Sequence, residues 1–155
     1  MLHVLVINGV NLNLLGIREK EHYGTFSLTE LEKAVAEKAA RLGIETDFFQ
    51  SNHEGALVEA IHAARGRFSH IIINPAAHTH YSLAIHDAIK GSGVPAIEVH
   101  ISNIHARESF RKHSVVAPAC IGQISGFGMQ GYFMALEYIH SLHTQDQSGE
   151  DGGER

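Results

Sequence analysis

The stretch "LHVLVINGVNLNLLGIREKEHYGTF", Leu2 to Phe26, decides the fold and raises the first question about function. Its first part, Leu2 to Ile7, is an apolar run that predicts a buried β-strand. The part that follows, Asn8 to Phe26, contains asparagines, acids, an arginine and a tyrosine, and it is far longer than most strand-to-helix connections. A polar loop of this length within a compact domain is either disordered or functional. The residues that the rest of the chain brings near it decide between the two.

A helix follows this loop, and the sequence marks both of its ends. Ser27-Leu-Thr-Glu30 has the spacing of a capping box, in which the serine caps the helix and the glutamate reaches back. Gly43 ends the helix. Between these ends, four positions recur with helical periodicity: Leu31, Val35, Lys38 and Leu42.

The pattern of a strand followed by a helix occurs five times, without an internal repeat. The further predicted strands are Ile44–Gln50, His70–Asn74, Val94–Val99 and Cys120–Ser125, and the further helices are Glu54–Arg65, Ser82–Lys90 and Gly128–Leu142. We expect the second helix to bury Leu57, Val58, Ile61 and Ala64, and the last to bury Met134, Ala135, Tyr138 and Ile139. Apolar strands separated by helices predict a parallel sheet covered on both faces. The expected fold is an α/β, flavodoxin-like doubly wound sandwich with a five-stranded parallel sheet.

Length and composition limit the possibilities further. The chain has 155 residues, of which 44% are hydrophobic, and this fits one domain, which we place at residues 1–143. From Thr144 onward the polar composition predicts a disordered tail, 144–155. The net charge is −5, and Lys and Arg form no block, so neither nucleic acid nor an anionic membrane is an expected partner. A single cysteine, Cys120, and an N-terminus without a signal-peptide pattern favour the cytoplasm.

In a doubly wound sheet, ligands bind outside the carboxyl ends of the strands. Polar residues collect at each of these ends: Asn8, Asn11 and Asn13, then Gln50 to His53, Asn74, His100 with Ser102, and Ser125 with Gly126. One rim of the sheet is therefore expected to carry the chemistry.

Several kinds of site are disfavoured by this set of residues. The first loop has no Gly-Lys-Ser/Thr phosphate motif, and no Gly-x-Ser-x-Gly elbow follows a strand. Gly126-Phe-Gly-Met-Gln-Gly131 has dinucleotide-type glycine spacing, but it follows the last strand, and a tight turn with close helix packing explains it better. A metal site on His78, His80, His100 and His105 is the remaining alternative, although no cysteine pair or HExxH motif accompanies it.

What remains is a set of acid–base residues: Tyr23 and Arg18 in the loop, and Glu98 and His100 on the fourth strand, with Arg107 and Arg111 beyond. Residues two apart in a strand share a face, so Glu98 can orient the ring of His100. Each residue also has an ordinary structural interpretation, as a solvated strand residue or a surface loop residue.

Four segments together closely resemble type II 3-dehydroquinate dehydratases. They are "NGVNLNLLGIRE…YG" at Asn8–Gly24, "NPAAHTH" at Asn74–His80, "EVHISNIHARESFRKHS" at Glu98–Ser114 and "GFGMQGYFMAL" at Gly126–Leu136. The resemblance runs from about Leu2 to Leu142, in the same order. It implies a cofactor-free enzyme without a metal, assembled as a homododecamer of trimers, that reversibly dehydrates 3-dehydroquinate to 3-dehydroshikimate through an enolate. The long loop would then be a lid that carries the catalytic base.

The resemblance also implies roles for individual residues. Tyr23 would be the base, Arg18 would help to deprotonate it, and Asn11 would hold a water against the enolate oxygen. His100, held by Glu98, would protonate the departing hydroxyl. Substrate binding would fall to Asn74, His80, Arg111, Ile101 and Ser102, with Asp87 supplied by a neighbouring subunit. A free tyrosine is only about 0.1% phenolate at pH 7, so a basic tyrosine needs nearby cations, and arginine suits this because it stays protonated.

The chain departs from the family pattern at a few positions: Val10, Lys20, His78, Tyr81 and His86. Lys20 matters most, because it replaces a proline and so frees the backbone of the lid. The sequence leaves open whether the enzyme serves aromatic biosynthesis or quinate breakdown. The alternative to an enzyme is a flavodoxin-like nucleotide- or metal-binding module without dehydratase activity.

Overall fold

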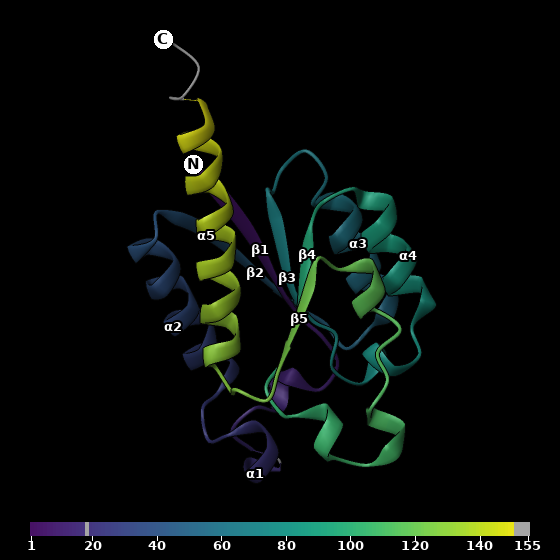
Figure 1. Cartoon of the computed structure of the whole chain (residues 1–155). Coiled ribbons are helices and arrows are strands. Elements are labelled where there is room, and N and C mark those ends of the chain that lie inside the picture. Colours follow the sequence, from purple (N-terminus) through teal and green to yellow (C-terminus); the bar gives the residue numbers. More distant parts are fainter. Residues whose placement is uncertain (18, 151–155) are drawn as a thin grey trace.

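The protein is an α/β sandwich around one parallel sheet, as a computed structural model that describes residues 1–17 and 19–150 shows (Figure 1). The strands lie in the order β2-β1-β3-β4-β5, and every neighbouring pair is parallel. Their bounds are β1 Leu2–Asn8, β2 Ile44–Gln50, β3 His70–Asn74, β4 Ala96–His100 and β5 Gly122–Ser125. The predicted flavodoxin-like fold with five parallel strands is confirmed.

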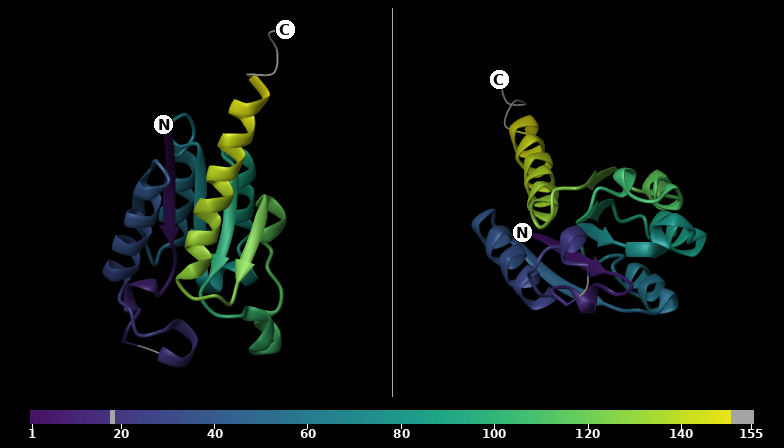
Figure 2. Two further views of the ribbon diagram at one scale, coloured as in Figure 1. Left: turned by 60° about the vertical axis from the view of Figure 1, so that its left-hand side comes forward. Right: turned by 90° about the horizontal axis from the view of Figure 1, so that it is seen from below.

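Helices cover both faces of the sheet. Figure 2 shows helices α2 (Leu28–Arg41) and α5 (Gln130–Glu150) on one face and α3 (Glu54–Ala63) and α4 (Leu83–Ser92) on the other. Ser27 caps α2 as predicted, because its hydroxyl accepts a hydrogen bond from the Glu30 N–H at 3.1 Å. A short helix, α1 (Lys20–Tyr23), and the 3₁₀ turns η1 (Leu12–Leu14), η2 (Ala76–His80), η3 (Ile104–Ala106), η4 (Ser109–Arg111) and η5 (Ala117–Ala119) complete the described elements.

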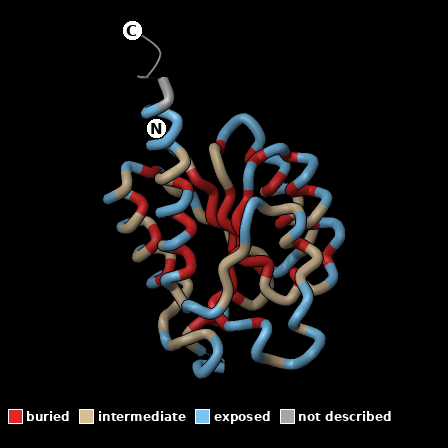
Figure 3. The backbone as a smooth tube through the Cα atoms, in the orientation of Figure 1, coloured by how far each residue is buried: buried red, intermediate tan, exposed pale blue. Residues whose placement is uncertain are grey.

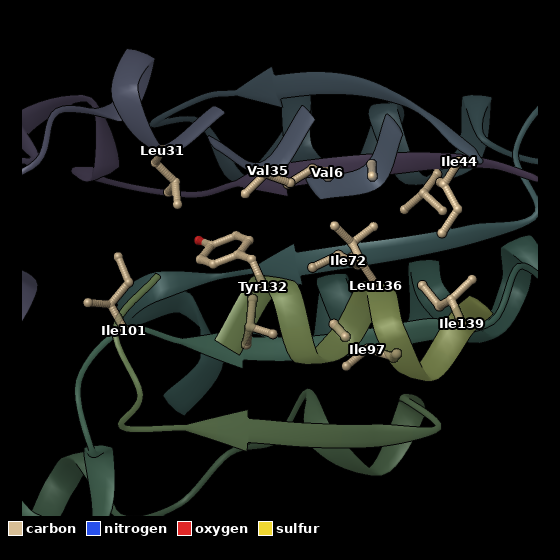
Figure 4. Close-up of a cluster of buried hydrophobic side chains, with 14 of the residues drawn as sticks. Val6, Leu31, Val35, Ile44, Ile72, Ile97, Ile101, Tyr132, Leu136 and Ile139 are labelled. Carbon is tan, nitrogen blue, oxygen red and sulfur yellow. The ribbon is translucent and has the colours of Figure 1, made fainter. Parts of the chain in front are cut away.

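The core consists of two apolar layers, one on each side of the sheet, and the buried residues follow the strands (Figure 3). The layer beneath α2 and α5 includes Val6, Ile72 and Leu136, with the Tyr132 ring among them (Figure 4). The central strands β1, β3 and β4 are mostly buried, whereas β2 at the sheet edge exposes Glu45 and Asp47. The core therefore fixes the strand ends from which the polar loops leave.

One face of the last helix differs from the prediction. Met134 and Tyr138 were expected to point inward, but they are 40% and 50% exposed. The side chains that α5 buries are Tyr132, Ala135, Leu136 and Ile139. Met134 and Tyr138 form an apolar i, i+4 pair of their own, so periodicity alone could not tell which of two adjacent stripes faces the sheet.

Helix α5 also extends beyond the predicted end. It continues to Glu150, through residues 144–150, for which the composition predicts disorder. Its residues from Thr144 to Ser148 are exposed, and the Thr144 hydroxyl donates to the Ser141 carbonyl within the helix. These turns are held by local hydrogen bonds rather than by tertiary packing. Among the helices that the structure describes, α5 included, none is long and apolar enough to cross a membrane.

Candidate active site

A small cavity of about 90 Å³ lies at the carboxyl end of the sheet. Loops that follow β1, β3 and β4 line it together with the short helix α1, so segments distant in sequence meet here. Eight of the predicted site residues are among its lining: Asn11, Tyr23, Asn74, His80, His100, Ile101, Ser102 and Arg111. The rim that the sequence singled out is thus a real concavity.

Tyr23 enters the cavity from the end of α1, and Arg107 holds it there. The Arg107 Nη1 donates a hydrogen bond of 2.8 Å to the Tyr23 hydroxyl and another of 3.2 Å to the Ser102 hydroxyl. The guanidinium carbon also lies 5.2 Å from the centre of the Tyr23 ring. Because the Arg107 side chain is only 7% exposed, its charge acts on the phenol oxygen with little screening by water.

Arg107 also ties α1 to the opposite loop. Its Nη2 lies 3.5 Å from the Glu19 carboxylate at the start of α1, and its Nε lies 3.8 Å from Glu108. One guanidinium therefore links the two ends of α1, through Glu19 and Tyr23, to the segment after β4.

His100 lines the cavity at the end of β4, and Glu98 lies beside it on the same strand. Glu98 is fully buried, and its Oε2 lies 3.5 Å from the Nε2 of His100, which is 5% exposed. Burial alone would raise the pKa of Glu98, but the adjacent His100 and the hydrogen bonds from Thr79 and Gln123 hold the pKa below its ordinary value. The pair is therefore arranged as an ionised carboxylate beside a ring that can carry a proton.

The amide side chains at the strand ends are fixed by a second set of contacts. Asn11 has a left-handed backbone (φ 67°), and its N–H donates to the Asn52 side chain at 2.9 Å. The Asn74 amide donates to the Tyr132 hydroxyl at 3.1 Å, and that hydroxyl donates to Asn8 at 2.7 Å. Asn11 is thus tied to the loop after β2, and Tyr132 of α5 links the last residues of β1 and β3.

The remaining predicted residues fall into three groups. His80 and Arg111 line the cavity. The Nδ1 of His80 lies 2.8 Å from the His113 carbonyl oxygen, and burial lowers the pKa of His80. Asp87 is exposed on α4 and does not line the cavity of its own chain. Arg18 lies outside the described residues.

The alternative sites gain little from the geometry. Gly126 has a φ of 97°, and a Cβ there would lie 3.0 Å from the Asn103 Cβ, so the glycine serves a tight turn between two loops. Within residues 1–17 and 19–150, no group of three or more His, Cys, Asp or Glu side chains is arranged to hold a metal ion. A larger depression of about 520 Å³ lies beside β2 and α3, but its lining of Leu5, Phe49 and similar residues includes none of the predicted site residues.

Comparisons with known proteins identify the family of the chain. Residues 2–140 match the family model described as dehydroquinase class II. The chain belongs to this family. The 3-dehydroquinate dehydratase of Caldicellulosiruptor bescii is 62% identical over 143 residues, which are 92% of this chain and 99% of that protein. The 3-dehydroquinate dehydratase of Clostridium perfringens is 56% identical over 137 residues, covering 88% of this chain and 95% of the relative.

Solved structures of class II dehydroquinases have the same fold. The type II dehydroquinase of Propionibacterium acnes superposes with a TM-score of 0.88 at 42% identity, covering 91% of this chain and 97% of that one. The type II dehydroquinase of Butyrivibrio crossotus superposes with a TM-score of 0.86 at 47% identity, covering 88% of this chain and 96% of that one. The chain has the activity of a 3-dehydroquinate dehydratase, a hydro-lyase.

Sequence reasoning left two parts of this dehydroquinase site unassigned. Arg107 was noted only as a cation beyond His100, because its distance along the chain from Tyr23 hides their contact. Tyr132 was not singled out, since an aromatic residue in a helix looks like ordinary core. Its hydrogen bonds to two strand-end asparagines are visible only in three dimensions.

Proposed function

We propose that Tyr23 and His100, which line the same cavity, are the base and the acid of the dehydration. The observation that carries this proposal is the Tyr23 hydroxyl, held at 2.8 Å by the nearly buried guanidinium of Arg107, in the same cavity as the His100–Glu98 pair. The guanidinium fixes the Tyr23 oxygen in the cavity, where a group that accepts a proton from the substrate is needed. The reaction requires these two opposite proton transfers.

The steps follow from the positions of these groups. Tyr23 removes a proton from the carbon beside the ketone of 3-dehydroquinate, and the electron pair forms an enolate. Asn11 holds a water against the enolate oxygen. The enolate then collapses, the carbon–oxygen bond of the hydroxyl breaks, and His100 supplies the proton with which the hydroxyl leaves as water. Glu98 stabilises the charged ring of His100 before this transfer.

Substrate binding falls to the other residues of the cavity. Asn74, His80 and Arg111 are placed to bind substrate hydroxyls, and Ile101 with Ser102 the carboxylate. Asn74 is well suited, because its hydrogen bond to Tyr132 and its acceptance of the Ala76 N–H at 3.0 Å fix the amide plane. A fixed amide presents its free lone pair and N–H in one direction only.

The loop from Asn8 to Phe26 acts as a lid. The cavity of about 90 Å³ is much smaller than ligand pockets, which typically measure about 300–1,000 Å³. Substrate entry therefore requires α1 to move away from Arg107. We assign to Arg18 the role of a second lid cation near Tyr23.

The setting of the enzyme is part of the same proposal. We place the enzyme in the cytoplasm. We propose that it assembles as a homododecamer in which Asp87 reaches the site of a neighbouring subunit. Its pathway is either aromatic biosynthesis or quinate breakdown. Growth of a deletion strain without aromatic supplements, and on quinate, separates the two pathways.

The chemistry is tested by mixing purified, metal-stripped protein with 3-dehydroquinate and following the ultraviolet absorbance of the conjugated enone product. We expect turnover without added metal or cofactor. Borohydride added with substrate should leave the activity intact, because an enolate route forms no imine to reduce. Turnover restored only by zinc would contradict the assignment to Tyr23 and His100, and no turnover would favour a binding module.

A further inference from the structure

The surroundings of Glu98 go beyond its contact with His100. The carboxylate is fully buried, and three neutral side chains from separate segments hydrogen-bond to it. The hydroxyl of Thr79, in η2, donates to Oε1, and the hydroxyl of Ser114 lies 2.9 and 3.1 Å from the two oxygens. The amide of Gln123, on β5, donates to Oε2.

Gln123 differs from Thr79 in the carboxylate oxygen that it binds. The Oε2 atom of Glu98 faces the Nε2 of His100. This oxygen accepts hydrogen bonds from two side chains, Ser114 and Gln123. Thr79 binds the other oxygen, and its neighbour His80 lines the cavity. Gln123 therefore fixes the oxygen that matters for His100 without lining the cavity itself.

The location of Gln123 makes this contact unusual. It is half-buried on the edge strand β5, and it lines a groove of about 270 Å³ on the outside of the sheet, with Ile121, Ile124 and Tyr138. A core of apolar residues would be the simplest way to pack this edge. An amide that reaches inward to a buried carboxylate instead supplies a hydrogen bond that the carboxylate needs in order to stay charged.

We infer that Gln123 is a positioning residue of the dehydration, which holds Glu98 ionised and turned toward His100. This inference rests on the proposed function of His100 as the acid. Removing the amide donor leaves Oε2 short of one hydrogen bond in a site closed to bulk water. The protonated form of Glu98 then becomes easier to reach, and a protonated Glu98 no longer stabilises charge on His100.

Two variants of Gln123 test the inference through the pH dependence of kcat. Gln123→Met keeps the size of the side chain but removes the donor, and Gln123→Glu adds a second carboxyl group beside Glu98. The pKa of Glu98 is held low in the folded protein, so loss of a donor raises it, and activity disappears at a higher pH on acidification. We expect the acidic limb of Gln123→Met to move up by roughly 1–2 pH units, and that of Gln123→Glu further.

At pH values well above this limb the carboxylate is ionised in every variant, so kcat of Gln123→Met should lie within a few-fold of the parent enzyme. A loss of equal size at every pH, with the limb unmoved, would show a merely structural role and overturn the inference. The matched control is Ser69→Ala, which removes a 3.0 Å hydrogen bond to the His3 carbonyl, away from Glu98. The acidic limb of the pH profile of kcat should not move in Ser69→Ala.

A double variant shows whether Gln123 acts through Glu98. In a Glu98→Gln background, Gln123→Met should cause no further loss of kcat, whereas additive losses would overturn the inference. If Glu98→Gln itself retains full turnover, the proposed role of the His100–Glu98 pair is wrong. The other outcome separates the two proposals. If Glu98→Gln lowers kcat but Gln123→Met leaves the acidic limb of the pH profile where it was, the role of Gln123 is wrong and that of the His100–Glu98 pair stands. Should Gln123→Met fail to fold, Gln123→Glu provides the same measurement.

Discussion

The Tyr23 hydroxyl is the single atom on which the proposed mechanism depends most. Tyr23→Phe keeps the ring against Arg107 but removes the ionisable oxygen. We expect kcat to fall by about 10²–10⁴ or more, the range for a general base, with little change in ligand affinity. Steady-state kinetics and ligand titration measure the two effects. Tyr138→Phe, on the exposed face of α5, is the control, and near-normal turnover of Tyr23→Phe would make His100 the leading candidate for the base.

Arg107 should matter nearly as much, because its guanidinium holds the Tyr23 hydroxyl. Arg107→Met removes both the charge beside Tyr23 and the link to Glu19, so we expect a loss of about 10²–10³ in kcat, as for other electrostatic groups in active sites. Arg67→Met is the matched control, because Arg67 also lies over an aromatic ring, that of Phe68, at 5.4 Å. Equal effects of the two substitutions on kcat would show that Arg107 serves packing rather than chemistry.

At the scale of elements, the site depends on how closely the end of β1 approaches the end of β3. The Gly9 N–H donates to the Asn74 carbonyl at 2.8 Å, and a Cβ on Gly9 would lie 2.8 Å from the Pro75 carbonyl oxygen. Backbone atoms cannot move aside as a side chain can, so Gly9→Ala must separate the two loops that carry Asn11 and Asn74. We expect lower thermal stability and a marked loss of kcat/KM.

Gly55→Ala is the comparison for this substitution. Gly55 lies in the first turn of α3, and a Cβ there would meet nothing within 4 Å. We expect it to stabilise the protein by about 0.5–1 kcal/mol, as alanine does in helices, and to leave kcat unchanged. Thermal unfolding and steady-state kinetics on both variants measure the contrast, and a harmless Gly9→Ala would contradict the close approach.

Which elements form was predictable from the sequence, because the apolar strands and helical periods are strong local signals. The bounds of β2 and β3 were predicted correctly, and so was the Ser27 cap. An error occurred where the signal was ambiguous, because α5 has two adjacent apolar stripes and periodicity does not tell which one faces the sheet. Glu98 and His100 were paired from strand geometry, but the contact between Arg107 and Tyr23 depends on how two loops fold toward each other.

At the scale of the whole molecule, the outer surface of α4 suggests where a second subunit binds. Leu83 is 65% exposed and lies one helical turn before Asp87, and Tyr81, next to the start of α4, is 63% exposed. Large apolar side chains exposed beside one another are typical of interfaces. This surface agrees with the proposed oligomer, in which Asp87 completes the site of a neighbour.

Complementation between two inactive chains tests this arrangement directly. Because Tyr23 and Asp87 would serve the same site from different subunits, Tyr23→Phe and Asp87→Ala should each be impaired alone. When the two are co-expressed, mixed oligomers contain sites that combine Tyr23 of one chain with Asp87 of the other, and activity should return in part. Co-expression of Tyr23→Phe with His100→Ala is the control, because both residues belong to one chain's cavity and no intact site can form. Light scattering checks that the mixtures assemble. No recovery in the Tyr23→Phe and Asp87→Ala mixture, equal recovery in both mixtures, or a fully active monomer would contradict the shared site.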